Sequence, residues 1–397
     1  GHISDARLSG SGVADFSFGP IAAGGNGGDL SITLTADAAG GALAGQRVAV
    51  VSNFGNVATQ TLQLSGFTTV LAQGLATPAG PVDLGNFRVG RLPDASTTLS
   101  VTNTTTGDGA ERLGLASATA SGPFTASNVL GSGLVLPGAT AAGAVGVATS
   151  GGAVGANSGS VTLQFTSNGT LIDPSFNTLA TNLQVVAISA TGFEVAQPAL
   201  PLSPVSVGNY RLTTGASSSF TVANTHVAPA GFQELLNASF GGAAPGVTVA
   251  GAIAGLAPGD SSNAMAIGFA AGGAAGPRSG SATVNLVSDG TGTSNLGLFN
   301  LASGTVDVSG TAFNVAVGAA TPTPVLVPNQ RMNGVGGSAT VALAVTNAAP
   351  AGSFSEALNA SFQASSGSAT TNGGSLANLA AGASNSTALV VGIDNTQ

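Results

Sequence analysis

The stretch Ser218-Ser219-Phe220-Thr221-Val222-Ala223-Asn224-Thr225 decides the fold of this chain. Within it, two apolar residues and an asparagine occupy alternate positions, and a period of two is the signature of a strand with one buried face. The pattern occurs three times, as Leu99/Val101/Asn103, Phe220/Val222/Asn224 and Leu343/Val345/Asn347. The asparagines are 121 and 123 residues apart, and so regular a spacing predicts a tandem repeat.

A glycine turn recurs at nearly the same interval. Proline presets φ for a turn and glycine accepts positive φ, so a Pro-Gly pair marks a turn. The four copies are Ile21-Ala22-Ala23-Gly24, Leu134-Val135-Leu136-Pro137-Gly138, Leu256-Ala257-Pro258-Gly259 and Leu379-Ala380-Ala381-Gly382. An alternating strand follows each of the first three turns, over residues 45–50, 158–165 and 279–286. These strands close on Ser52-Asn53, Ser167-Asn168-Gly169 and Ser288-Asp289-Gly290, where Asn-Gly and Asp-Gly predict tight hairpins.

A last strand leads out of each copy, through Leu62/Leu64, Val186/Ile188 and Val306/Val308. It runs on into segments that carry prolines, namely Pro198, Pro201 and Pro204, and later Pro322, Pro324 and Pro328. Proline-bearing connections are extended and semi-rigid, which predicts a rod of modules with restricted bending. Helix formers gather at residues 233–236 and 355–358, and we expect a helical turn at each.

These landmarks divide the chain into residues 1–76, 77–195, 196–316 and 317–397. The first copy begins partway through a module and the last ends partway through one. A repeat of about 120 residues, with short strands and frequent turns, reads as an immunoglobulin-like β-sandwich. We therefore predict an all-β chain of tandem sandwich modules. A right-handed β-helix shares the composition, but its rungs would repeat at a much shorter interval.

The composition excludes several classes of protein. Only 6% of the residues are charged, against about 25% in an ordinary globular chain. All eight positive charges are scattered arginines, Trp is absent and Tyr210 is the single tyrosine, so a nucleic-acid partner is rejected. Cysteine is absent, so no disulfide or thiolate metal site can hold the fold together. The most apolar region, residues 246–276, is too interrupted for a membrane-spanning segment.

The repeat also resembles a known family. The segments that carry the likeness are Val82-Asp83-Leu84-Gly85, Val89-Gly90, Leu99-Ser100-Val101-Thr102-Asn103-Thr104, Gly122-Pro123-Phe124, Leu136-Pro137-Gly138 and Ser158-Gly159-Ser160-Val161. In this order they resemble bacterial surface modules of the choice-of-anchor D type, which are similar to Hydin/ASH-like immunoglobulin folds. The resemblance implies a fold and no catalytic residues.

No constellation of residues indicates catalysis, a cofactor or a metal. The chain has two histidines, His2 and His226, and we interpret His226 as a turn residue rather than a base. The segment Gly24-Gly25-Asn26-Gly27-Gly28-Asp29 matches the start of a calcium-binding nonapeptide, but a single copy reads as a glycine-rich loop. The repeated asparagines are the sharpest polar positions. They form either a ligand-binding ladder or, the reading we favour, side chains that bond backbone in the following turn.

We predict a non-enzymatic structural protein that is secreted to the cell surface or beyond. Our first hypothesis is a subunit of a bacterial extracellular filament, stalk or sheath that polymerises with copies of itself. The second is the spacer region of an adhesin whose ligand-binding tip lies outside this sequence, and a carbohydrate-binding module is a distant third because it would present Trp and Tyr platforms. We expect the chain to be a window on a longer repetitive protein. We also expect strands near Val48–Val50 or Leu343–Val345 to contact a neighbouring chain.

Overall fold

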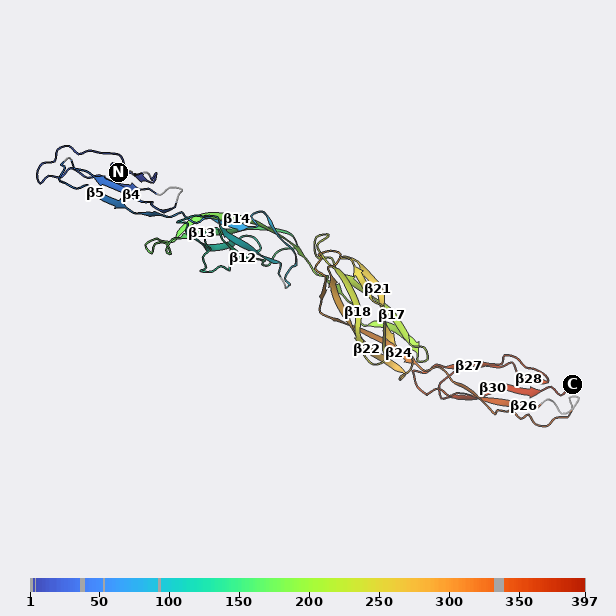
Figure 1. Cartoon of the computed structure of the whole chain (residues 1–397). Helices are drawn as coiled ribbons and strands as arrows, with labels where there is room; N and C mark the ends of the chain where they lie inside the picture. Colours follow the sequence, from blue (N-terminus) through green and yellow to red (C-terminus); the bar gives the residue numbers. More distant parts are fainter. Residues whose placement is uncertain are drawn as a thin grey trace. The chain divides into compact units, whose positions relative to one another are not determined.

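The computed structural model describes residues 3, 5–35, 40–52, 54–91, 94–331 and 339–396 of the chain. Every regular element in these residues is a β-strand (Figure 1), which confirms the predicted all-β class. The chain divides into two compact units, Gly1–Glu194 and Val195–Gln397. Each unit holds one full sandwich and one smaller group of strands.

The sandwich of the first unit consists of two four-stranded sheets. One has the order β11 (Phe124–Asn128), β12 (Thr140–Thr149), β9 (Ser96–Asn103), β7 (Gly74–Thr77). The other has the order β10 (Arg112–Ala120), β13 (Gly155–Asn168), β14 (Leu179–Phe193), β8 (Val82–Arg88). Leu99 and Val101 of the repeated strand β9 are fully buried against Val161 and Leu163 of β13, so the inward face is the one that the alternation predicted.

The sandwich of the second unit repeats this plan. Its first sheet has the order β15 (Pro198–Ala199), β17 (Ala216–Asn224), β21 (Ser261–Phe269), β19 (Val247–Ala250). Its second has the order β16 (Val205–Arg211), β24 (Gly304–Phe313), β22 (Gly276–Asp289), β18 (Leu235–Ala243), β20 (Ile253–Leu256), and β23 (Leu298–Asn300) also pairs with β22. Phe220 and Val222 of β17 contribute to the core with Met265 and Val284. In both sandwiches one edge is a parallel pair, β8 with β14 and β16 with β24.

The smaller groups hold fewer strands. The first contains three antiparallel pairs: β1 (Leu8–Ser9) with β2 (Thr33–Leu34), β3 (Gly41–Ala42) with β6 (Phe67–Thr68), and β4 (Gln46–Val50) with β5 (Gln60–Leu64). The last contains a sheet of order β25 (Gly318–Thr321), β26 (Thr340–Asn347), β30 (Ser384–Ile393), β28 (Ala369–Thr371), and the pair β27 (Leu358–Ser361) with β29 (Ser375–Leu379). Val50 and Leu62 are 52% and 58% exposed, whereas Leu163 and Val186 on the strands β13 and β14 of the next copy are fully buried.

The two expected helical turns are wrong. Strand β18 begins at Leu235 and strand β27 at Leu358, inside the segments that were expected to form helical turns. Leu236 is fully buried and pairs with Ser288 of β22. Burial in a sheet therefore overrides the local helix propensity of these residues.

The expected tight hairpins are longer loops. Strand β13 ends at Asn168 but β14 begins only at Leu179, and β22 ends at Asp289 with the next strand at Leu298. The Asn168 side chain accepts a hydrogen bond from the Thr170 amide at 3.1 Å, and Asp289 accepts one from Thr291 at 3.0 Å. These side chains open a loop by bonding the backbone two residues on. Asn53, at the corresponding place in the first copy, lies outside the described residues.

The prolines do not lie where one copy joins the next. Pro198 belongs to β15, and Pro201 and Pro204 lie in the loop between β15 and β16. Pro322 and Pro324 likewise follow β25. The prolines therefore stiffen the first strand of a copy and the loop behind it. The connection before that strand is held by other residues, which form the candidate site.

Candidate functional site

Each repeated asparagine is a fully buried clamp between its strand and the glycine turn. Asn103, Asn224 and Asn347 are all 0% exposed. The Nδ2 amide of Asn224 donates to the carbonyls of Glu234 at 3.1 Å and Leu256 at 3.0 Å. The other two asparagines make the same pair of bonds, Asn103 to Glu111 and Val135 at 3.0 and 3.3 Å, and Asn347 to Glu356 and Leu379 at 3.0 and 3.1 Å. Both N–H donors of each side chain are therefore used within its own copy.

The glycine turn also donates a hydrogen bond to the backbone of the same asparagine. The amides of Gly138, Gly259 and Gly382 donate to the carbonyls of Asn103, Asn224 and Asn347 at 3.0, 2.7 and 2.8 Å. Each of these glycines has a positive φ, between +70° and +87°, which the turn requires. The residue after the glycine accepts from the asparagine amide, at 3.0 Å in all three copies. The two strongest sequence landmarks are therefore each other's partners, and this geometry fits the structural reading of the asparagines.

A glutamate follows each asparagine and carries a buried carboxylate in the two full sandwiches. Glu111 is 4% exposed and Glu234 is 0% exposed. The Glu111 carboxylate accepts hydrogen bonds from the hydroxyls of Ser167 at 2.6 Å and Thr69 at 2.8 Å. The Glu234 carboxylate accepts from Ser288 at 2.7 Å and from Ser294. These donors stabilise a charge that would otherwise be costly to bury.

The same serines also hold the segment that leads into the module. Ser167 Oγ accepts a hydrogen bond from the Ala72 amide at 2.7 Å, and Ser288 Oγ accepts one from the Ala196 amide at 2.8 Å. Each serine therefore donates its proton to the glutamate and presents a lone pair to the incoming backbone. Both alanines are buried, at 0% and 1% exposed.

A short parallel bridge completes the connection, which we call the joint. In the first unit, the Val70 amide donates to Gly109 and the Glu111 amide donates to Val70, both at 2.9 Å. In the second unit, the Asn314 amide donates to Phe354 at 2.9 Å and the Glu356 amide donates to Asn314 at 3.0 Å. These two bridges occupy the same places in the repeat, at the first and third joints, whereas the contact of Ala196 with Ser288 belongs to the second joint.

The third joint, which leads into the last group of strands, has a solvent-exposed ion pair. Arg211 Nε donates to Glu356 Oε1 at 2.7 Å, and the two side chains are 61% and 32% exposed. The hydrogen bond and charge of Glu356 raise the pKa of Arg211 above its ordinary value. Beside this ion pair the rings of Phe313 and Phe354 meet edge to face, with their centroids 5.9 Å apart. An exposed ion pair of this kind contributes little to stability, so the backbone bridge and the rings hold most of this joint.

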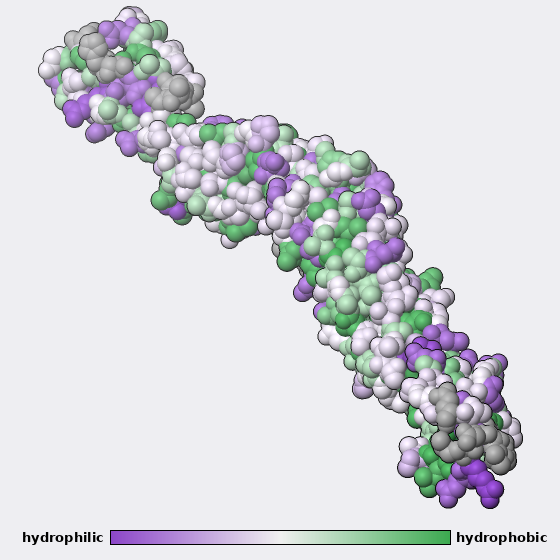
Figure 2. Space-filling view, turned by 90° about the vertical axis from the view of Figure 1, so that its right-hand side faces the viewer, coloured by the Kyte–Doolittle hydropathy of each residue, from purple (hydrophilic) through white to green (hydrophobic). Residues whose placement is uncertain are grey.

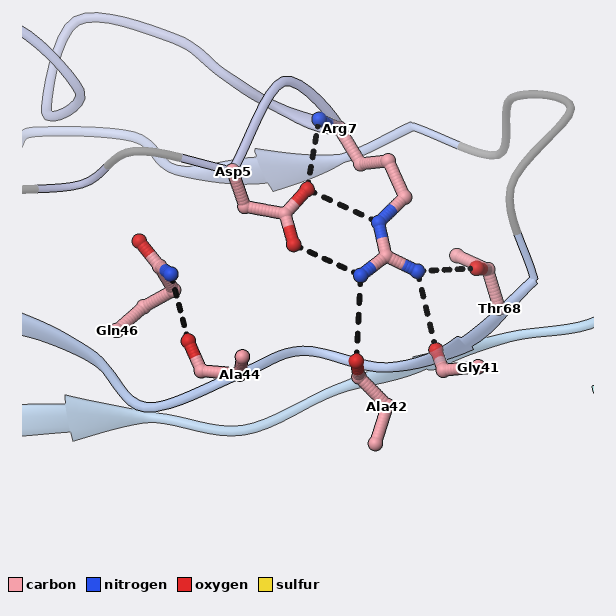
Figure 3. A network of polar contacts seen from close by, with 7 residues as sticks. All are labelled: Asp5, Arg7, Gly41, Ala42, Ala44, Gln46 and Thr68. Carbon is pink, nitrogen blue, oxygen red and sulfur yellow. Dashed lines mark hydrogen bonds and ion pairs between the residues drawn. The ribbon is translucent and has the colours of Figure 1, made fainter. Parts of the chain in front are cut away.

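A separate polar network ties together the first group of strands (Figure 3). The Arg7 guanidinium donates to Asp5 through Nε at 2.9 Å and Nη2 at 2.7 Å. Its remaining N–H groups reach the Ala42 carbonyl, the Gly41 carbonyl and the Thr68 hydroxyl at 3.2, 3.1 and 2.9 Å. All five guanidinium donors are therefore used. The hydrogen bonds and charge of Arg7 lower the pKa of Asp5 to about 2.

The residues tested for chemistry in the sequence are not brought together. His226 is exposed in the loop after β17, and His2 lies outside the described residues. Residues 24–29 form an exposed loop in which Asn26 accepts the Gly28 amide at 3.1 Å. Among the described residues no three His, Asp or Glu side chains are placed to share a metal ion. An open groove of about 480 Å³ beside β15 and β17 is lined by uncharged residues, among them Leu200, Pro204 and Phe220.

Sequence reasoning missed the glutamates of the joint. The chain contains four glutamates, and three of them are Glu111, Glu234 and Glu356, at intervals of 123 and 122 residues. In a chain so poor in charge, that recurrence was a readable signal. The Asp5–Arg7 network had no such signal, because neither residue recurs with the repeat.

The comparisons with known proteins find likeness only at the level of fold. No family model matches the chain, and no curated protein matches its sequence. The solved structures that it resembles include extracellular cadherin domains 3-6 of protocadherin gamma B2, at 12% identity and a TM-score of 0.26, over 64% of this chain and 56% of that one. They also include domains EC1-3 of mouse protocadherin-24, at 12% identity and a TM-score of 0.31, over 77% and 89%. A three-domain immunoglobulin fragment of titin matches at 8% identity and a TM-score of 0.25, over 83% and 90%.

These are tandem β-sandwich domains, as this chain is. Their identities and TM-scores are too low to carry an argument about function. The chain spans 56% of the protocadherin gamma B2 fragment. The resemblance to choice-of-anchor D modules finds no support from a family model and stays a prediction. Among the described residues no helix has the length and apolar character needed to cross a membrane.

Proposed function

We propose that this chain is a structural subunit of a secreted bacterial filament, stalk or sheath, built from tandem immunoglobulin-like modules. The proposed module boundaries follow residues 76, 195 and 316. The observation that carries the proposal is the joint: the polar residues that recur there form hydrogen bonds with backbone groups. The recurring polar atoms of the repeat thus serve to connect and fix modules. We propose no catalytic role and no cofactor for them.

We infer that copies of the chain associate through the strands β4 and β5. These strands pair only with each other among the described residues, and their outer edges carry no further strand there. Val50 and Leu62 add exposed apolar side chains to that surface. An unpaired edge beside apolar side chains is a surface on which another strand can add. Strand β26 fits this role less well, because at Val345 it is paired on both sides, by β25 and β30.

The second candidate is the spacer of a cell-surface adhesin. In that case the joints would hold modules in series while recognition lies elsewhere. The oligomeric state of the purified chain distinguishes the two proposals. A spacer stays monomeric at micromolar concentration, whereas a polymer subunit associates.

Light scattering on a matched pair of variants tests the proposal. Leu62→Asp places a charge on the β4–β5 surface, and we expect it to suppress association of the chain. The control is Leu202→Asp, because Leu202 is a fully exposed leucine in the second unit, outside the proposed contact. We expect that variant to associate as the unchanged chain does. Equal association of both variants would rule out the β4–β5 surface as the contact, and absence of association in the unchanged chain would favour the spacer.

A further inference from the structure

The incoming backbone is held by a chain of three groups that come from distant parts of the repeat. The Ala196 amide donates to Ser288 Oγ at 2.8 Å, and the Ser288 hydroxyl donates to Glu234 Oε2 at 2.7 Å. Ser288 lies near the end of β22 and Glu234 directly precedes β18, so the two meet only when these strands are paired. The first unit repeats the arrangement with Ala72, Ser167 and Glu111.

We infer that the buried Glu–Ser pair is a conditional lock on the joint. The pair fixes the backbone that enters a module only while that same module is folded. A carboxylate can only accept hydrogen bonds, so it fixes the direction of the serine proton. The serine oxygen is then turned toward the alanine amide as an acceptor. Loss of the carboxylate frees the hydroxyl to rotate, and the amide loses an oriented partner even though the serine remains. The lock operates equally in a filament subunit and in an adhesin spacer.

The third joint position lacks this lock, which makes it an internal comparison. Ala316 stands where Ala72 and Ala196 stand, two residues before the strand that pairs with the repeated strand. The Val317 amide is still held by Asn347 Oδ1 at 3.1 Å. Glu356, however, turns to Arg211, and no serine hydroxyl donates to its carboxylate among the described residues. The asparagine clamp and the glutamate lock are therefore separable parts of the joint.

Hydrogen exchange at single amides of the full chain tests the lock. A local opening raises exchange at the amides that it exposes, whereas a loss of global stability raises exchange at the core ladders too. In Ser288→Ala we expect the Ala196 amide to exchange about fivefold faster or more, with little change in the β22–β24 ladder. The control Ser279→Ala removes an exposed serine from the same strand and leaves Ala196 unchanged.

Glu234→Ala is the decisive variant, because it leaves Ser288 in place. We expect faster exchange at Ala196 there too, while Ala72 in the other unit stays protected. Glu234→Gln keeps a hydrogen-bond acceptor and Ser288→Thr keeps a hydroxyl. We expect both variants to retain most of the protection of the Ala196 amide. In the unchanged chain we expect Ala316 to exchange faster than Ala72 and Ala196. Uniform acceleration of all amides in Glu234→Ala and in Glu234→Gln, or full protection of Ala196 in Glu234→Ala, would overturn the lock.

Discussion

At the scale of single residues, the repeat is defined by polar side chains that are buried. Asn224 has no exposed surface, and its amide and oxygen make bonds to the Glu234 and Leu256 carbonyls and to the Gln197 amide. A buried polar group is tolerated only when its hydrogen bonds are made. An apolar residue of similar size could fill the volume but would leave those backbone groups without partners. The recurrence of the asparagine is therefore explained by the hydrogen bonds that it makes to backbone groups, without a ligand.

Replacing the clamp should destabilise its unit strongly. Asn224→Ala leaves two carbonyls and one amide without their partner, and we expect a loss of about 3 kcal/mol or more in the free energy of unfolding. Asn263→Ala is the control, because Asn263 is exposed on β21, and there we expect a change of at most about 0.5 kcal/mol. Urea unfolding measures both. Equal effects from the two substitutions would contradict a role in the fold.

Asn224→Asp makes the same test dependent on pH. The introduced carboxylate would face two carbonyl oxygens, so the folded protein favours its protonated form and its folded-state pKa is raised. Stability should then fall as the pH rises above about 4, the ordinary value of an aspartate. Unfolding at pH 4 and pH 7 measures this. A variant that is as stable at pH 7 as at pH 4, relative to the unchanged chain, would argue against the carbonyl contacts.

The Asp5–Arg7 pair should give the first unit a pH dependence opposite in sign to that of the Asn224→Asp variant. Arg7 lowers the pKa of Asp5 to about 2, so the pair contributes stability that is complete above about pH 4 and is lost as the pH falls toward 2. The chemical shift of the Asp5 carboxyl reports this titration directly. Asp5→Asn should reduce the acid sensitivity of the first unit. An Asp5 midpoint near 4 would mean that the network of Figure 3 does not hold in solution.

At the scale of strands and turns, the sequence was informative wherever one face of an element repeats. Alternation placed Leu99, Val101 and Asn103 on the buried face of β9, and the glycine spacing located the turns. It failed where distant strands decide the outcome. Residues 233–236 favour a helix locally, but pairing with β22 makes a strand of them from Leu235 onward. The joint could not be derived, because Ser167 and Glu111 are 56 residues apart and meet only in the folded sheets.

The glycine turn offers a prediction at this scale. Gly259 has a φ of +87°, a conformation that costs an L-residue about 1–2 kcal/mol, so Gly259→Ala should destabilise the second unit by roughly that amount. Its control is Gly242→Ala in β18, where an added Cβ meets nothing within 4 Å and φ is not positive. We expect that substitution to be neutral or slightly stabilising. Thermal unfolding of the two variants compares them directly, and an equal loss in both would contradict the turn's role.

At the scale of the whole molecule, charge is too sparse to organise contacts. The chain carries 8 positive and 16 negative side chains in 397 residues. On the face drawn in Figure 2 most residues are pale, and strongly hydrophilic ones form small, separate groups. The described residues include an exposed ion pair, Arg211–Glu356, which contributes little. In the proposed assembly, contacts between copies would therefore come from backbone pairing and apolar side chains.

Assembly should accordingly be insensitive to salt. Raising sodium chloride from about 0.05 to about 1 M shortens the reach of exposed charges to about 3 Å but leaves strand pairing and apolar burial in place. We expect the size distribution from light scattering to change little over this range. Dissolution of the assemblies at high salt would show that electrostatic attraction holds the copies together.

The most direct test of the proposed function is the appearance of the purified chain. Negative-stain images at micromolar concentration should show extended assemblies of many copies, and Leu62→Asp should reduce them to single chains while Leu202→Asp does not. Single chains at every concentration, for the unchanged protein as for both variants, would contradict a polymer subunit and leave the adhesin spacer as the better account.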